Sequence, residues 1–216
     1  MENVKAFGVF EKQGNYIFRN SAYLQWGTKE ESIGSFLLLN PGNAKPSIGN
    51  IEQEITGEQS IQIDATMRQM IKLVEKIREN KQLEGRVQIY NLFSLRNPKS
   101  DKAILEYEDL VESRMINPKE TIPSVEELQK HPWVCCGWGV NTEKRYKHLQ
   151  EIKSLWKNRL AESGILYFGK LHENGLDYRH LKPMLTSQQD QLLKDLLKIY
   201  NTSIMNRAKI VESELI

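Results

Sequence analysis

The chain has 216 residues, of which 39% are hydrophobic and 27% charged, and a formal net charge of +2. These values are typical of a folded globular protein and exclude a disordered or fibrous chain. The small net charge excludes a surface that is basic all over, although a local basic groove is still compatible with it. The length suits a single domain over residues 1–216. No apolar run approaches the ~18 residues of a membrane span, and the first residues do not resemble a signal peptide.

Segments 15–19 and 22–26 of the first 33 residues predict an N-terminal hairpin or edge strands. Four later apolar runs have the length of a strand and end near Gly, Asn or a polar cluster. These runs are residues 36–39, 86–93, 133–138 and 165–169.

Apolar residues spaced three and four apart predict helices over residues 64–80 and 141–163, and Gly164 follows the second as a stop signal. Residues 187–216 predict one or two C-terminal helices, opened by Thr186 or Ser187 as a cap. Four prolines lie between residues 97 and 132, so this segment is expected to form short helices and loops.

Strands that alternate with helices predict an α/β fold, here a three-layer α/β/α domain with a central, mostly parallel sheet of about four strands. Ligands of such sheets bind beyond the carboxyl ends of the strands. The sequence places distinctive residues at three of these ends, namely Asn40-Pro41-Gly42, Asn91 and Trp138-Gly139.

Familiar catalytic and phosphate-binding motifs are absent, and the four histidines show no metal-ligand spacing. We therefore expect neither a metal nor an organic cofactor. The adjacent Cys135 and Cys136 would form a strained disulfide, so buried free thiols in a reducing cytoplasm are expected. Neutral polar groups at strand ends suit chemistry that needs a positioned water and a bound amide edge. The alternatives are an ordinary Asn-Pro-Gly turn and a capping role for Asn91.

The order of these motifs resembles domain of unknown function family 1643, found in bacteria and phages. The resemblance covers most of residues 15–185. Its last motif, a His-Pro pair, is incomplete in this sequence. The matching positions are Leu39-Asn40-Pro41-Gly42 with Ala44, Asp64-Ala65-Thr66, Asn91-Leu92-Phe93 with Arg96, Trp138-Gly139 and His180-Leu181-Lys182-Pro183.

A more distant likeness is to the uracil-DNA glycosylase superfamily, whose mismatch-specific branch carries an Asn-Pro-Gly motif after its first strand. This likeness implies a uracil-DNA-glycosylase-like fold and excision of a modified, deaminated or mismatched base, in DNA repair or phage defence. Asn40 would hold the attacking water and Asn91 would read the flipped base. His180 or Lys182 would stabilise the transition state. The partner would be duplex or single-stranded DNA.

Further contacts follow from the same likeness. Tyr16, Tyr90 and Phe93 are candidates for an aromatic platform under the base, and packing in the core is the alternative for each. Arg96 is a candidate phosphate ligand. Pro41 and Gly42 would shape the loop around the substrate.

Two other functions are compatible with the same motifs. One is a catalytically silent module that binds a nucleotide or DNA, for example in phage–host conflict, and the other is a different small-molecule enzyme. The sequence shows no acidic residue near the Asn-Pro-Gly turn, which favours weak or specialised activity over fast hydrolysis.

Overall fold

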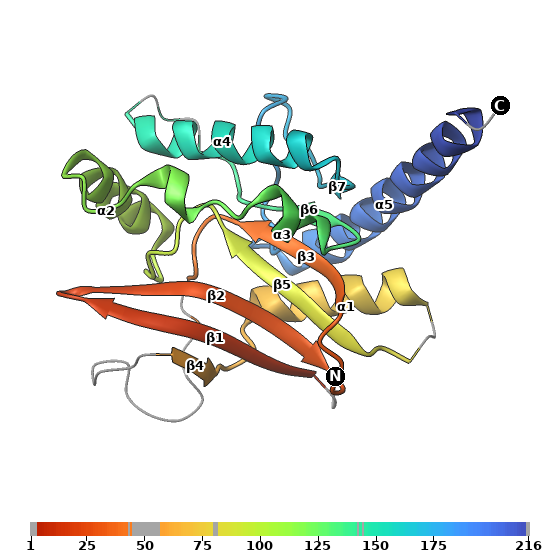
Figure 1. The fold of residues 1–216 in the computed structure, drawn as a ribbon, viewed down its shortest axis with the longest axis horizontal. Coiled ribbons are helices and arrows are strands. Elements are labelled where there is room, and N and C mark those ends of the chain that lie inside the picture. The colour runs from red at the N-terminus through yellow and green to blue at the C-terminus, as the bar shows by residue number, and fades with distance from the viewer. Residues whose placement is uncertain are drawn as a thin grey trace.

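The computed structural model describes residues 4–42, 44, 57–79, 82–141, 143 and 145–214, with side chains through residue 204. Its strands form one seven-stranded sheet in the order β4-β1-β2-β5-β3-β6-β7 (Figure 1). The strands are β1 (Val4–Gln13), β2 (Tyr16–Trp26), β3 (Ser32–Leu38), β4 (Gly57–Ser60), β5 (Gly85–Asn91), β6 (Val134–Cys136) and β7 (Tyr167–Phe168). The helices are α1 (Ala65–Arg78), α2 (Ser100–Glu112), α3 (Val125–Gln129), α4 (Lys147–Ser163) and α5 (Thr186–Glu214), with a 3-10 turn at Pro118–Thr121.

Strands β5, β3, β6 and β7 run parallel to one another and coincide with the four apolar runs, which confirms the predicted α/β class. Strands β1 and β2 form an N-terminal hairpin, but the two segments predicted to make it both lie in β2, and its first strand, β1, was not predicted. The expectation of a mostly parallel sheet of about four strands is wrong, because β2 pairs antiparallel with the open edge of β5. The hairpin and β4 then continue the sheet, which is therefore mixed.

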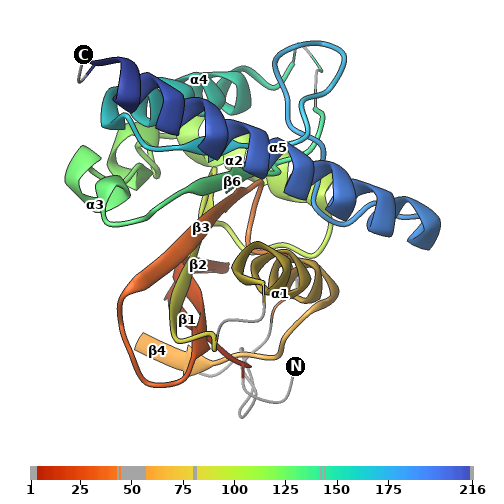
Figure 2. The same ribbon diagram turned by 90° about the vertical axis from the view of Figure 1, so that its right-hand side faces the viewer.

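Helices cover both faces of the sheet (Figures 1 and 2). Apolar side chains of α1 and α5 pack on one face, together with those of Phe36, Leu38 and Ile89. Side chains of α2, α3 and α4 pack on the other face in a second cluster. Successive strand residues point to opposite faces, so each central strand contributes to both clusters.

Two helix ends follow their sequence signals, whereas Thr186 and Ser187, the predicted caps of the C-terminal helix, lie inside it. Asp64 caps α1 by accepting a hydrogen bond from the Met67 amide at 2.8 Å. Gly164 ends α4 in the left-handed conformation, and the C-terminal segment is one helix, α5. The proline-rich segment is more regular than expected, because α2 occupies 13 residues between Pro98 and Pro118.

Cys135 and Cys136 are free and buried, as expected, and burial raises the pKa of both thiols. Within the described ranges, no group of His, Cys, Asp and Glu side chains is arranged to hold a metal ion. The helices of the described part of the chain are too short or too polar to cross a membrane.

Gly34, in the middle of β3, is expected to tolerate no side chain. Its φ of +154° disfavours other residues, and an added Cβ would overlap the ring of Trp133. We expect Gly34→Ala to lower the free energy of unfolding by about 2 kcal/mol or more, from overpacking and backbone strain together. Denaturant unfolding measures this loss.

Gly14→Ala is the matched control for this variant. Gly14 also has a positive φ, of +59°, but no atom lies within 4 Å of an added Cβ. Its substitution should cost only the backbone strain, about 1 kcal/mol. Equal losses for the two variants would contradict the packing explanation at Gly34.

Candidate functional site

A cavity of about 240 Å³ lies where the carboxyl ends of β3 and β5 meet the start of α1. This is the edge of a parallel sheet at which ligands bind. Six segments line the cavity: the end of β3 with the Asn40-Pro41-Gly42 turn, Ile89 of β5, Arg19 of β2, the start of α1 (Asp64, Thr66, Met67 and Met70), Pro98 with Ser100 at the start of α2, and the loop residue His180. The structure thus brings together four of the predicted site residues, namely Asn40, Pro41, Gly42 and His180.

Asn40 is half-buried in the cavity wall, and its carboxamide has a fixed orientation. Its Nδ2 donates to the carbonyl of Asn97 at 2.9 Å. Among the described residues its Oδ1 has no partner, so the acceptor end of the amide is available to a ligand or a water.

Asn91 is the last residue of β5 and pairs in register with Leu38, a residue of the cavity wall. By strand alternation its side chain points to the same face of the sheet as Ile89, which also lines the cavity. The Asn91 Oδ1 is buried and lacks a hydrogen-bond partner. Unpaired buried acceptors are uncommon, and this one lies at the end of a strand beside the cavity.

Arg19 is a cavity residue that the sequence pattern did not indicate. Its side chain is only 3% exposed, and its Nε and Nη1 have no hydrogen-bond partner. Burial lowers the pKa of its guanidinium to about 10, although the nearby Asp64 favours the charged form. The guanidinium therefore stays protonated at neutral pH.

A β-bulge aims Arg19 into the cavity. Arg19 pairs with Phe10 and Ser21 with Val9, so Asn20 is the extra residue on β2. Bulges shift the alternation of a strand and re-aim its side chains. Here Phe18 joins the core on the α2 side, whereas Arg19 points to the α1 side.

Asp64 supplies the acidic group that the sequence did not place near the Asn-Pro-Gly turn. The expectation of no such group is wrong, because the start of α1 folds back against the end of β3. The carboxylate already accepts the Met67 amide, and it lies near Arg19 and His180 without forming an ion pair with either among the described residues.

His180 is at the rim of the cavity and remains exposed to solvent. Its Nδ1 lies 3.1 Å from the carbonyl of Lys182 and 3.2 Å from the amide of the same residue. The protein around the ring still lowers the pKa of His180 by desolvation, so the neutral imidazole dominates at neutral pH.

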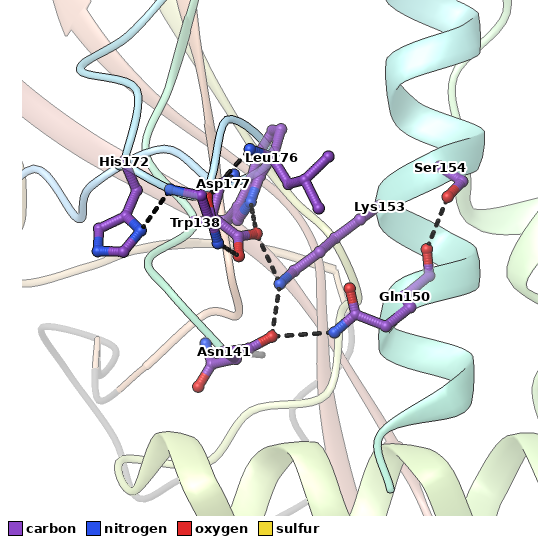
Figure 3. A network of polar contacts seen from close by, with 9 residues as sticks. Trp138, Asn141, Gln150, Lys153, Ser154, His172, Leu176 and Asp177 are labelled. Carbon is purple, nitrogen blue, oxygen red and sulfur yellow. Dashed lines mark hydrogen bonds and ion pairs between the residues drawn. The ribbon is translucent and has the colours of Figure 1, made fainter. Parts of the chain in front are cut away.

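A buried ion pair holds the loop that carries His180. Lys153 of α4 contacts Asp177 at 2.8 Å, and the two side chains are 3% and 4% exposed (Figure 3). Asp177 also accepts from Trp138 Nε1 and from Asn174 Nδ2, each at 3.0 Å. Burial opposes ionisation of Asp177, but these hydrogen bonds and the Lys153 charge outweigh it, and the pKa of Asp177 lies below its ordinary value. The loop is thereby fixed to α4 three residues before His180.

Two aromatic candidates lie on the other face of the sheet. Phe93 is 1% exposed and stacks on Tyr107, with ring centroids 4.4 Å apart, inside the α2 side of the core. The Tyr90 hydroxyl lies 2.7 Å from His131 Nε2, and its ring packs beside Trp156. Adjacent strand residues alternate in direction, so Tyr90 points away from the cavity that Asn91 faces. Neither ring can serve as a platform for a base in the cavity.

The remaining three candidates do not line the cavity. Tyr16 packs partly buried against the α2 side of the core. Arg96 donates to the Ala44 carbonyl at 3.1 Å, and burial lowers its pKa. The backbone carbonyl and amide of Lys182 contact the His180 ring nitrogen Nδ1.

Larger hollows exist elsewhere in the described part of the chain. One of about 760 Å³ lies at the opposite end of the sheet, between Val4, Trp26 and Glu84. Another of about 690 Å³ runs between Gly139, Arg179 and α5, and shares His180 with the cavity. Neither is lined by Asn40 or Arg19, so we assign the candidate site to the smaller cavity.

Fold and site together define an α/β protein with a small polar cavity at the carboxyl ends of its parallel strands. Comparison with protein-family models, with curated proteins and with solved structures gave no match to this chain.

Proposed function

We propose that the protein is a DNA glycosylase-like hydrolase with a uracil-DNA-glycosylase-like fold. It takes one base out of DNA into the cavity and releases it by attack of water on the N-glycosidic bond. The observation that carries this proposal is that the cavity combines the Asn40 carboxamide with Asp64 and His180 at the carboxyl ends of β3 and β5. No metal or organic cofactor takes part.

Asn40 positions the attacking water. Because its Nδ2 donates to the Asn97 carbonyl, its Oδ1 can accept a hydrogen bond from the water. A lone pair of the water oxygen is then directed at the sugar. As the bond from the anomeric carbon to the base nitrogen breaks, the sugar becomes oxocarbenium-like. The water oxygen bonds to that carbon, and the electron pair of the broken bond leaves with the base.

His180 and Asp64 handle the proton and the charge. The neutral imidazole of His180 accepts the proton that the water loses, because its lowered pKa keeps it unprotonated beforehand. The Asp64 carboxylate stabilises the positive charge on the sugar.

Asn91 reads the base. A carboxamide offers one acceptor and two donors, which can pair with the edge of an extruded base. The buried and unpaired Oδ1 of Asn91 supports this role, since a ring N–H of the base would satisfy it.

A screen of duplex and single-stranded DNAs that carry different bases tests the proposal. The panel includes deaminated and mismatched bases and genomic DNA from phages with modified bases. Released base is detected by mass, and the strand is then tested for alkali-labile sites. We expect one class of base to be released. No release from any substrate by folded protein would contradict the proposal.

The alternative is a catalytically silent module that binds a nucleotide or DNA through the same cavity. This alternative is supported by the Asp64 carboxylate. It already caps α1, so one of its oxygens is less available for catalysis. This module would retain DNA in a salt-dependent manner without releasing a base.

A further inference from the structure

Arg19 has a local environment that no role in folding explains. It is 97% buried, two of its nitrogens lack partners, and no ion pair joins it to any described carboxylate. A buried cation without a hydrogen-bonded partner destabilises the folded state. Such a group is retained where a ligand supplies the hydrogen-bond acceptors that the protein lacks.

The charged and apolar groups around Arg19 restrict what that ligand can be. Asp64 and Arg96 are the charged side chains whose fields reach it, and they oppose each other. Ile89, Met67 and Met70 give the cavity an apolar lining on the same side of the sheet. The site thus combines one donor-only cation with surfaces suited to a planar ring.

We infer that Arg19 is the specificity-determining residue of the cavity, and that it receives the carbonyl edge of an oxo-base such as uracil, thymine or hypoxanthine. This inference rests on the proposed function, in that the cavity receives a base. Arginine has donors and no acceptor, so it binds an edge that presents oxygen or nitrogen lone pairs. Adenine has no carbonyl group, and its amino group would instead place a donor against a donor.

Arg19 also favours the bond-breaking step. When the bond between base and sugar breaks, its electron pair remains on the base, and the carbonyl groups of an oxo-base spread the negative charge. A guanidinium already fixed beside that charge stabilises it without reorganisation. The water supplies the new bond to the sugar, and its proton goes to His180 and then to the departing base.

A phosphate fits this site less well than a base does. The Asp64 carboxylate occupies the N-terminus of α1, where the free amides of a helix would otherwise attract an anion. A phosphate would bring two negative charges into a small cavity that already holds that carboxylate. A base that is neutral on entry avoids this repulsion.

Binding of free bases to the protein tests the inference without requiring catalysis. Equilibrium dialysis is performed with uracil, hypoxanthine, adenine and inorganic phosphate. We expect uracil or hypoxanthine to bind at least about tenfold more tightly than adenine. Arg19→Met should lose this preference. Preferential binding of phosphate, or an unchanged preference in Arg19→Met, would overturn the inference.

Arg68→Met is the matched control, because Arg68 is exposed on α1 and should affect neither binding nor excision. Thermal unfolding distinguishes recognition from a structural role. We expect Arg19→Met to unfold at the same temperature as the parent protein or higher, since it removes a buried unpaired charge. A strongly destabilised Arg19→Met protein would contradict the inference. Base binding that depends on Arg19, without base release from any DNA, would refute the hydrolysis and leave the inference intact.

Discussion

Replacing Asn40 by alanine is expected to lower the rate of base release by at least about 100-fold, since the attacking water loses the group that positions it. The fold should change little. The side chain makes one hydrogen bond, to the Asn97 carbonyl, and its loss should cost about 1 kcal/mol of stability. Single-turnover release of base from the best substrate measures the effect on the chemical step.

Asn201→Ala is the control for this variant. Asn201 is exposed on α5, and its substitution should leave the rate unchanged. Asn40→Asp separates two contributions, because it keeps an acceptor for the water but loses the donor to the Asn97 carbonyl. A rate for Asn40→Ala within about threefold of the parent would contradict the water-positioning role.

The second large effect concerns the ion pair between Lys153 and Asp177. Asp177→Ala leaves the Lys153 ammonium buried without its partner and removes the acceptor of Trp138. We expect the free energy of unfolding to fall by about 3 to 5 kcal/mol. Base release should fall as well, because the loop that carries His180 loses its attachment to α4. Denaturant unfolding and release assays measure the two effects.

The double variant Lys153→Met with Asp177→Asn provides the control. It removes both charges and keeps an oxygen that accepts from Trp138, so most of the lost stability should return. A double variant as unstable as Asp177→Ala would show that the buried charge is not the cause.

The ionised pair also makes stability depend on pH. The pKa of Asp177 is lowered in the folded protein, so its contribution is present above the unfolded pKa of about 4 and is lost as the pH falls through the folded pKa. Unfolding followed on the acid side should therefore show a smaller pH dependence in the double variant than in the parent protein.

Much of the fold follows from local patterns in the sequence. The four apolar runs become the parallel strands, and Asp64 and Gly164 mark helix ends through their capping chemistry. The Asn40-Pro41-Gly42 turn falls at the predicted strand end and lines the cavity. These features depend on residues close together in the chain.

The other parts of the site depend on contacts between distant segments. Arg19 reaches the cavity only because one extra residue, Asn20, shifts the alternation of β2, and a bulge has no clear sequence signal here. Asp64 approaches Asn40 only through the packing of α1 on the sheet. Phe93 lies in the core because the chain turns to the α2 side after β5. An arginine inside an otherwise apolar strand is the one signal that could have identified Arg19.

The central claim is that a base enters the cavity lined by Asn40 and Arg19 and reaches Asn91 beside it. Heteronuclear NMR of the two carboxamide groups and of the Arg19 Nε–H, during titration with free uracil and hypoxanthine, tests it most directly. All three signals should move together and saturate at one ligand concentration. Signals that stay fixed while resonances elsewhere in the protein respond would contradict the assignment of this cavity.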